Sequence, residues 1–201
     1  MKPLPEIILA SGSPRRAELL RQIHVSFHVC VSDVDESENA PTEPEPHVIE
    51  LSRRKALAVA TSFPSRIIVG ADTIVALDNS ILGKPETPYE AKEMLRRLSG
   101  RLHFVYTGVT MVHGDRIISD VERTTVCFRS ISDEEIDRYV ESNEPMDKAG
   151  GYGIQGFGAL FVDGIQGCYF NVVGFPIACF QKMTNRFLKN KTQSTSPIKS
   201  V

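Results

Sequence analysis

Residues 102–128, LHFVYTGVTMVHGDRIISDVERTTVCF, decide the fold class. Apolar and polar side chains alternate over residues 102–112 and again over 116–128, with His113-Gly114-Asp115 between the two runs. Alternation with a period of two on both sides of a short glycine-containing turn predicts two long antiparallel strands. A purely parallel sheet contains no such pair. We therefore expect an α/β protein with a long mixed β-sheet.

Strands and helices are also expected before this pair. Apolar runs at residues 6–10, 25–31 and 67–76 predict strands, and residues 14–22 and 47–62 predict helices. Ser13-Pro14 has the N-cap and first-turn residues of a helix start. Residues 33–46 are acidic and rich in proline, so a long loop is expected there.

The remaining elements follow from capping signals and glycine content. Thr87-Pro88-Tyr89-Glu90 and Ser132-Asp133-Glu134-Glu135 predict capping boxes, which open helices that end near residues 98 and 142. A last helix is expected from Pro176. Residues 143–158 are expected to form a glycine-rich loop, followed by strands at 160–165 and 168–173. Residues 1–189 are therefore expected to form one domain, and the polar residues 190–201 a disordered tail.

The composition is that of a soluble globular protein, with 41% hydrophobic and 24% charged residues in a chain of 201. The 23 Lys and Arg against 25 Asp and Glu give a net charge of −2, which argues against nucleic acid or a membrane surface as a partner. No apolar run approaches the roughly 18–20 residues of a membrane span, and the N-terminus lacks the pattern of a secretory signal. The four cysteines form no CxxC pair, so reduced thiols in the cytoplasm are expected.

A local cationic cluster lies at residues 11–16, SGSPRR, where the first expected strand leads into a helix. Free N–H groups and the positive end of the helix dipole favour an anion there. Arg15 and Arg16 oppose that dipole, a cost that a bound phosphate would offset through paired guanidinium contacts. The alternative is two solvated surface arginines. The cluster is not a Walker A loop, because GxxxxGK[ST] is absent.

Asp72 is an isolated acid directly after the apolar run IIVGA of residues 67–71. Burying a carboxylate is costly unless it is paired or binds a metal, which favours a functional role over one bonded only to backbone amides. Lys55 lies in the apolar stripe of its expected helix, where it either extends to solvent or points into a cleft. Lys84, in a Gly-Lys-Pro turn, carries only a weak signal, since a turn lysine is usually solvated.

Two further segments have compositions that suit a site. Five glycines between residues 150 and 158 predict tight turns and a close backbone approach, and neighbouring Asp147, Lys148 and Gln155 suit an edge that reads a base or holds phosphate. The alternative there is a flexible surface loop. The acidic residues 33–38 either ligate Mg²⁺ or form a solvated charge run. Cations, an isolated acid and an acidic loop together favour Mg²⁺-dependent hydrolysis of a phosphate ester or anhydride.

The motif LASGSPRRAELL resembles the opening signature of the Maf-like nucleoside triphosphate pyrophosphatases. GADTIV, LGKP, LSGRLHFVYTGV, ISDEEIDRYVESNEPMDKAGGYGIQG and YFNVVGFP also resemble that family, in the family's order, from about residue 7 to 187. The resemblance implies a fold like that of inosine triphosphate pyrophosphatase, with helices in two lobes around a central cleft. It also implies a homodimer and the reaction NTP + H₂O → NMP + pyrophosphate.

The resemblance also implies roles for individual residues. Asp72 would be the proton acceptor that activates water, and Glu36, Asp35 and Asp147 would place a divalent cation, Mg²⁺ or Mn²⁺. The residues that would hold the triphosphate are Ser11, Ser13, Arg16, Lys55 and Lys84.

Three positions that differ between branches of the family bear on the substrate. Arg15, Thr73 and Gln155 match the dTTP/UTP-specific branch. Glutamine both donates and accepts, as a uracil or thymine edge requires. The expected substrates are therefore dTTP, UTP and modified pyrimidine nucleotides. The alternatives are a 7-methyl-GTP pyrophosphatase and a non-catalytic nucleotide-binding regulator of cell division.

Overall fold

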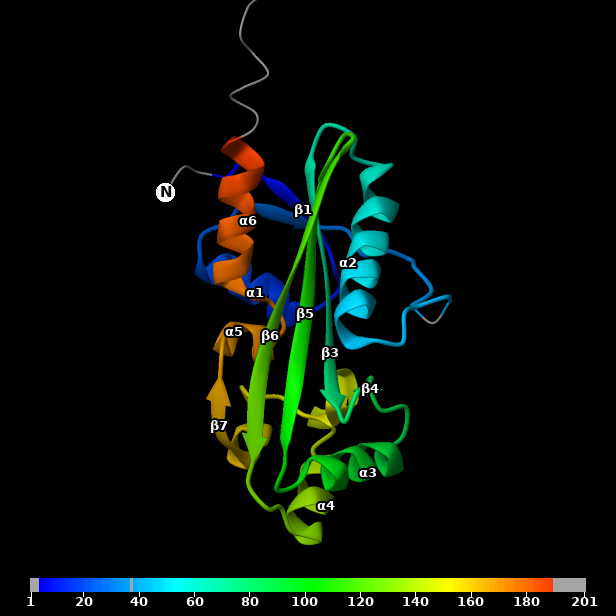
Figure 1. The fold of residues 1–201 in the computed structure, drawn as a ribbon, viewed down its shortest axis with the longest axis vertical. Coiled ribbons are helices and arrows are strands. Elements are labelled where there is room, and N and C mark those ends of the chain that lie inside the picture. Colours follow the sequence, from blue (N-terminus) through cyan, green and yellow to red (C-terminus); the bar gives the residue numbers. More distant parts are fainter. Residues whose placement is uncertain (1–3, 37, 190–201) are drawn as a thin grey trace, which may run out of the picture.

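One seven-stranded mixed sheet runs along the molecule in a computed structural model that describes residues 4–36 and 38–189 (Figure 1). The strand order is β2 (Phe27–Val29), β1 (Ile7–Ala10), β3 (Ile67–Leu77), β5 (Leu102–His113), β6 (Arg116–Phe128) and β7 (Val162–Gln166), and β4 (Ser80–Leu82) pairs with β3. The expected disordered tail, residues 190–201, lies outside the described residues.

β5 and β6 form the long antiparallel pair that the alternation predicts. Their register runs from Leu102 opposite Cys127 to His113 opposite Arg116. β1 is parallel to β2 and β3, whereas β3 with β5 and β6 with β7 are antiparallel pairs. The mixed sheet is therefore confirmed.

Helices cover both faces of the sheet at the end where β1 lies. α1 (Pro14–Gln22) and α6 (Ile177–Lys189) lie on one face, and α2 (Pro44–Ala60) lies on the other (Figure 1). Successive residues of β1 point to opposite faces of the sheet. Ile7 and Leu9 accordingly pack in the core with α1 and α6, whereas Ile8 and Ala10 pack against α2.

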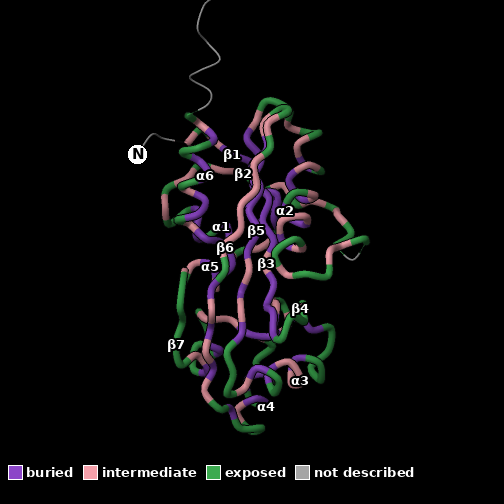
Figure 2. The backbone as a smooth tube through the Cα atoms, viewed as in Figure 1, coloured by how far each residue is buried: buried purple, intermediate pink, exposed green. Residues whose placement is uncertain are grey.

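A second core lies at the other end of the same strands, where α3 (Pro88–Leu98) and α4 (Asp133–Glu141) cover the sheet. β3 contributes Val69 to the first core and Val75 to the second, and β5 contributes Val109 and Val105 in the same way. The buried residues of both cores follow these continuous strands in Figure 2. The molecule thus has two lobes that share their central strands, as expected.

The segment 168–173 is a helical turn, so the strand expected there is wrong. It forms α5 (Tyr169–Val173), which Gly174 ends with a φ of 120°. Asn171 in this turn is fully buried, and its amide donates to the Val105 carbonyl and to the Thr124 hydroxyl, each at 3.0 Å. A short apolar run does not distinguish strand from helix by periodicity, and here the buried amide contacts favour the helix.

Smaller differences concern element boundaries. α2 begins at Pro44, three residues before the expected start, and β4 was not expected. The glycine-rich loop holds short 3₁₀ helices at Glu144–Asp147, Ala149–Gly151 and Phe157–Phe161, and β7 begins only after the last of them.

One of the two expected capping boxes forms. The Ser132 capping box is present in full, whereas the Glu90 side chain accepts from the Glu86 N–H instead of from the Thr87 N–H. No helix within the described ranges is both long and apolar enough to cross a membrane.

Candidate active site

An interruption along one edge of β3 positions the candidate site. β1 pairs with β3 only as far as Gly70, and β4 pairs with it only from Val75 to Leu77. A cleft of about 960 Å³ opens at this interruption, between the two lobes. Of the residues expected to form the site, only Asp35 does not line it. Those that do are Ser11, Ser13, Arg15, Arg16, Glu36, Lys55, Asp72, Thr73, Lys84, Asp147 and Gln155.

Two glycines allow α2 to lie directly on the sheet beside the cleft. A Cβ added to Gly70 would lie 2.3 Å from the Ser52 carbonyl oxygen, and one added to Gly108 would lie 2.2 Å from that of Val48. The hydroxyls of Ser52 and Thr110 also bond each other at 2.9 Å. Residues two apart in a strand point to the same face of the sheet. Asp72 therefore lies on the same face as Gly70, which is the face that α2 covers.

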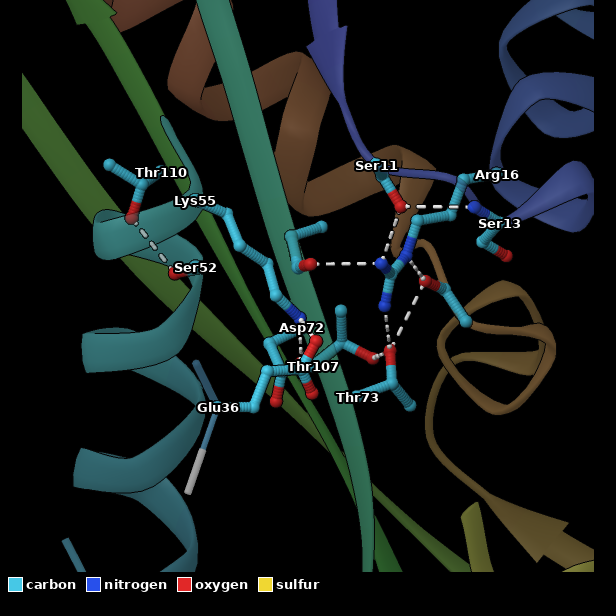
Figure 3. A network of polar contacts seen from close by, with 12 residues as sticks. Ser11, Ser13, Arg16, Glu36, Ser52, Lys55, Asp72, Thr73, Thr107 and Thr110 are labelled. Atoms are coloured by element: carbon cyan, nitrogen blue, oxygen red, sulfur yellow. Dashed lines mark hydrogen bonds and ion pairs between the residues drawn. The ribbon is translucent and has the colours of Figure 1, made fainter. Parts of the chain in front are cut away.

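Asp72 and Lys55 meet at this contact. Lys55 Nζ donates to Asp72 Oδ1 at 2.6 Å and lies 2.8 Å from Glu36 Oε1 (Figure 3). The Lys55 and Asp72 side chains are only 10% and 8% exposed, whereas that of Glu36 is 55% exposed. Lys55 therefore points into the cleft and supplies the counter-charge that a buried carboxylate needs.

The second oxygen of Asp72, Oδ2, is buried and has no hydrogen-bond partner among the described residues. Buried polar atoms are normally satisfied, so an orphaned carboxylate oxygen beside a cleft points to a ligand or water. This is the atom of the site best placed to accept a proton from a bound molecule.

Arg16 forms the floor of the cleft on the opposite side of β3. Its guanidinium donates to the carbonyls of Gly174 and Ala71 at 3.0 and 2.8 Å, and to the hydroxyls of Ser11 and Thr73 at 2.8 and 3.0 Å. Burial lowers its pKa from the ordinary value, although Asp72 and Glu36 oppose that shift. These contacts use four of its five N–H groups and leave one for a ligand.

The loop between β1 and α1 is held by the same guanidinium. The Ser11 hydroxyl accepts from Arg16 and from the Ser13 N–H, the latter at 3.3 Å. Ser13 occupies the expected N-cap position of α1, but its side chain makes no capping hydrogen bond. The first N–H groups of a helix have no partner within the helix, and Ser13, Arg15 and Arg16 at the start of α1 line this end of the cleft.

Arg15 and Asp147 join the two lobes across the cleft. Arg15 Nη1 donates to Asp147 Oδ2 at 2.7 Å, and Lys148 Nζ donates to Oδ1 at 2.6 Å. Burial raises the pKa of Asp147, but the hydrogen bonds from Lys148 and Arg15 outweigh it and leave that pKa below its ordinary value. Lys84 is exposed on the wall of the cleft.

The expected metal residues do not gather into one cluster. Within residues 4–36 and 38–189 there is no group of three or more His, Cys, Asp or Glu side chains able to hold a metal. Glu36 lies beside Asp72, since both carboxylates contact Lys55 Nζ. Mg²⁺ is often held by one or two carboxylates with substrate phosphates and water, so the half-exposed Glu36 carboxylate on the cleft fits such an ion. Asp147 is bound to Arg15 and Lys148 instead.

The residues expected to set specificity lie in two places. Gln155 is exposed on the cleft, in the glycine-rich segment. The Thr73 hydroxyl instead accepts from Arg16, bonds the Thr107 hydroxyl at 2.9 Å and lies 3.3 Å from the Gly174 carbonyl. Thr107 was missed from the sequence, because nothing there distinguishes it from the other buried polar residues of β5, such as Thr110.

The sequence also matches a known protein family. The model of the family described as "Maf-like protein" matches residues 6–187. The chain belongs to this family. Curated relatives named dTTP/UTP pyrophosphatase are 50% identical to this Maf-like chain. That of Bacillus mycoides matches over 94% of this chain and 99% of its own, and that of Bacillus cytotoxicus over 92% and 96%.

Among solved structures, the Ham1 protein of Staphylococcus aureus is similar at a TM-score of 0.44 and 18% identity, covering 64% of this chain and 73% of its own.

Proposed function

We propose that this Maf-like chain is a nucleoside triphosphate pyrophosphatase that converts dTTP and UTP to the monophosphate and pyrophosphate. The observation that carries the proposal is the buried Asp72, with one oxygen on Lys55 and the other unpartnered, in a cleft lined by cations. The names of relatives at 50% identity support the substrate class. Modified pyrimidine triphosphates are included in the proposed substrate class.

In this proposal Asp72 is the general base. Oδ2 accepts a proton from the attacking water, while the ammonium of Lys55 holds Oδ1 and so fixes the direction of the carboxylate. A positioned base of this kind contributes roughly 10²–10⁴-fold to a rate.

The triphosphate binds along the other cations of the cleft. The last N–H of Arg16, the turn of Ser11 and Ser13, and Lys84 supply donors, and the N-terminus of α1 adds its dipole. Glu36 would hold a divalent cation, Mg²⁺ or Mn²⁺, together with the phosphates, and the cation when bound would neutralise charge on the phosphate oxygens. Asp35 and Asp147 contribute less, since Asp35 does not line the cleft and Asp147 is engaged by two cations.

Base recognition is assigned to Gln155 and Arg15. The Gln155 amide both donates and accepts, which matches the edge of uracil or thymine. Thr73 acts on specificity through Arg16, whose guanidinium it holds at 3.0 Å.

A substrate panel tests this function. Purified protein is given dTTP, UTP, CTP, 7-methyl-GTP and the remaining nucleotides with Mg²⁺ or Mn²⁺, and pyrophosphate and orthophosphate are measured separately. Pyrophosphate release with preference for dTTP and UTP is expected. Preference for 7-methyl-GTP would identify the other branch of the family, and binding without turnover would identify a regulator; either result overturns the proposal.

We further propose that the protein is cytoplasmic and works as a homodimer. The described cysteines, Cys30, Cys127, Cys168 and Cys179, are all free thiols, which suits a reducing compartment. Exposed apolar side chains, Phe157, Leu160 and Ile165, lie at or near the edge strand β7 and suit burial against a second copy. Light scattering of the protein and of Ile165→Lys tests the dimer.

A further inference from the structure

Tyr139 and Glu144 form hydrogen bonds with both ends of the segment that carries Gln155. The Tyr139 hydroxyl accepts from the Gly153 N–H at 3.1 Å and donates to Glu144 Oε1 at 2.9 Å. Glu144 in turn accepts from the N–H groups of Phe157 and Gly158, at 2.9 and 3.2 Å. One tyrosine–carboxylate pair therefore binds the backbone before and after Gln155.

The segment wraps closely around the Glu144 carboxylate. A Cβ added to Gly156 would lie 2.4 Å from both Glu144 oxygens, so only glycine allows this approach. The backbone carbonyl of Glu144 also accepts from Lys148 Nζ at 2.5 Å. The carboxylate is thus enclosed by the loop that it holds.

Tyr139 is itself rigidly placed. It is 4% exposed on α4, and its ring packs edge-on against Phe161 with centroids 5.0 Å apart. Burial raises the pKa of Tyr139 above its ordinary value, so its hydroxyl stays protonated and donates to Glu144 at physiological pH. The Tyr139–Glu144 pair, called the clamp below, therefore connects the segment that carries Gln155 to the core of the second lobe.

We propose that Tyr139 and Glu144 are positioning residues that hold Gln155 in the geometry required for base recognition. This inference rests on the proposed function. Glu144 also lines the cleft, but both of its carboxylate oxygens already accept hydrogen bonds from Tyr139 and from the backbone, so they are not available to the nucleotide. The hydrogen bonds of the clamp order the loop before the nucleotide binds. The free-energy cost of ordering the loop therefore does not reduce the binding affinity.

The test uses Glu144→Ala, Glu144→Gln and Tyr139→Phe, with Glu135→Ala as matched control. Glu135 also accepts hydrogen bonds, from the Ser132 N–H and from the Arg129 guanidinium. It lies at the start of α4, however, and among the described residues it has no hydrogen bond with the glycine-rich segment. For each protein, kcat and KM are measured with UTP and CTP. Amide hydrogen exchange at Phe157 and Gly158 is measured without nucleotide.

Glu144→Ala is expected to raise KM for UTP about tenfold and to lower the UTP-to-CTP ratio of kcat/KM about tenfold, with kcat for UTP within about twofold of the wild type. Tyr139→Phe and Glu144→Gln keep part of the clamp, so their rise in KM and their fall in the UTP-to-CTP ratio should be smaller. Exchange at Phe157 and Gly158 should accelerate in Glu144→Ala and remain protected in Glu135→Ala.

Three results overturn the inference in different ways. If exchange accelerates while the UTP-to-CTP ratio equals that of the wild type, the clamp holds the loop but does not govern recognition. If the wild-type protein releases no pyrophosphate from any nucleotide, the proposed function itself fails and this inference fails with it. A ratio that falls equally in Glu135→Ala would show that general destabilisation is the cause, which also contradicts the proposal.

Discussion

The Lys55 ammonium is shared between Asp72, at 2.6 Å, and Glu36, at 2.8 Å. Asp72 is in the buried strand β3 and Glu36 is in the exposed acidic loop, so one lysine on α2 joins two carboxylates of opposite environment. The arrangement leaves Asp72 Oδ2 as the unpartnered oxygen, and it places the loop against the cleft.

Asp72→Asn should lower kcat by roughly 10²–10⁴-fold, because an amide has nearly the shape of the carboxylate but cannot accept the proton. The melting temperature should change little, since Lys55 keeps Glu36 as a partner. Steady-state pyrophosphate release and a thermal melt measure the two effects. Turnover equal to the wild type in Asp72→Asn would remove the assigned base.

Removal of divalent cations with a chelator should abolish turnover, and Mg²⁺ or Mn²⁺ should restore it. Glu36→Gln should raise the Mg²⁺ concentration needed for half-maximal activity, because it removes the carboxylate that would hold the ion. Asp147→Asn serves as control, since that carboxylate is already bound to Arg15 and Lys148. Equal Mg²⁺ requirements in both variants would contradict the assignment of Glu36.

Arg16→Lys should destabilise the protein by about 2–4 kcal/mol, because an ammonium cannot satisfy two carbonyls and two hydroxyls in the plane of a guanidinium. Arg15→Lys is a neighbouring control, and its more exposed ion pair is worth about 0–1 kcal/mol. Urea unfolding at pH 7 compares them. A stability loss as small in Arg16→Lys as in Arg15→Lys would show that the buried network does not stabilise the fold.

Stability should fall between pH 7 and pH 5 through His103. This side chain is fully buried beside the Tyr152 hydroxyl, at 2.8 Å, and burial lowers its pKa from 6.5 to about 4. Between these values the unfolded chain binds the proton and the folded one does not, so stability is present above pH 6.5 and is lost as the pH falls towards 4. The loss from pH 7 to pH 5 is about 2 kcal/mol.

His103→Phe should remove this part of the pH dependence, although it leaves the buried Tyr152 hydroxyl without its partner and is less stable at pH 7. Urea unfolding of both proteins at pH 7 and pH 5 provides the comparison. Parallel losses in wild type and variant would assign the acid sensitivity to other groups.

The mixed sheet was predictable because strand alternation and helix capping are local signals. The pairing of Lys55 with Asp72 was not, since it depends on how closely α2 approaches Gly70 and Gly108, and no sequence pattern reports that distance. The apolar run of residues 168–173 predicts a strand but is also compatible with a helix, and the buried hydrogen bonds of Asn171 accompany the helix that forms.

The candidate site shows the same division. Ionisable residues in unusual positions, such as Asp72 after an apolar run, were identified from the sequence. Residues that act through others were missed, because Tyr139 and Thr107 match the pattern of ordinary core positions. Their role depends on contacts between segments distant in the chain, which single-residue signals do not contain.

The continuity of β3 and β5 through both lobes has a consequence for how substrate enters. Enzymes that close by rotation of rigid domains use a few linker residues as a hinge. Here the strands that connect the lobes are also the strands that build both cores, so no such linker exists between them in the described part of the chain. We therefore expect a cleft of nearly constant width, in which nucleotide entry and product release are governed by side-chain and loop movements at the Arg15–Asp147 bridge.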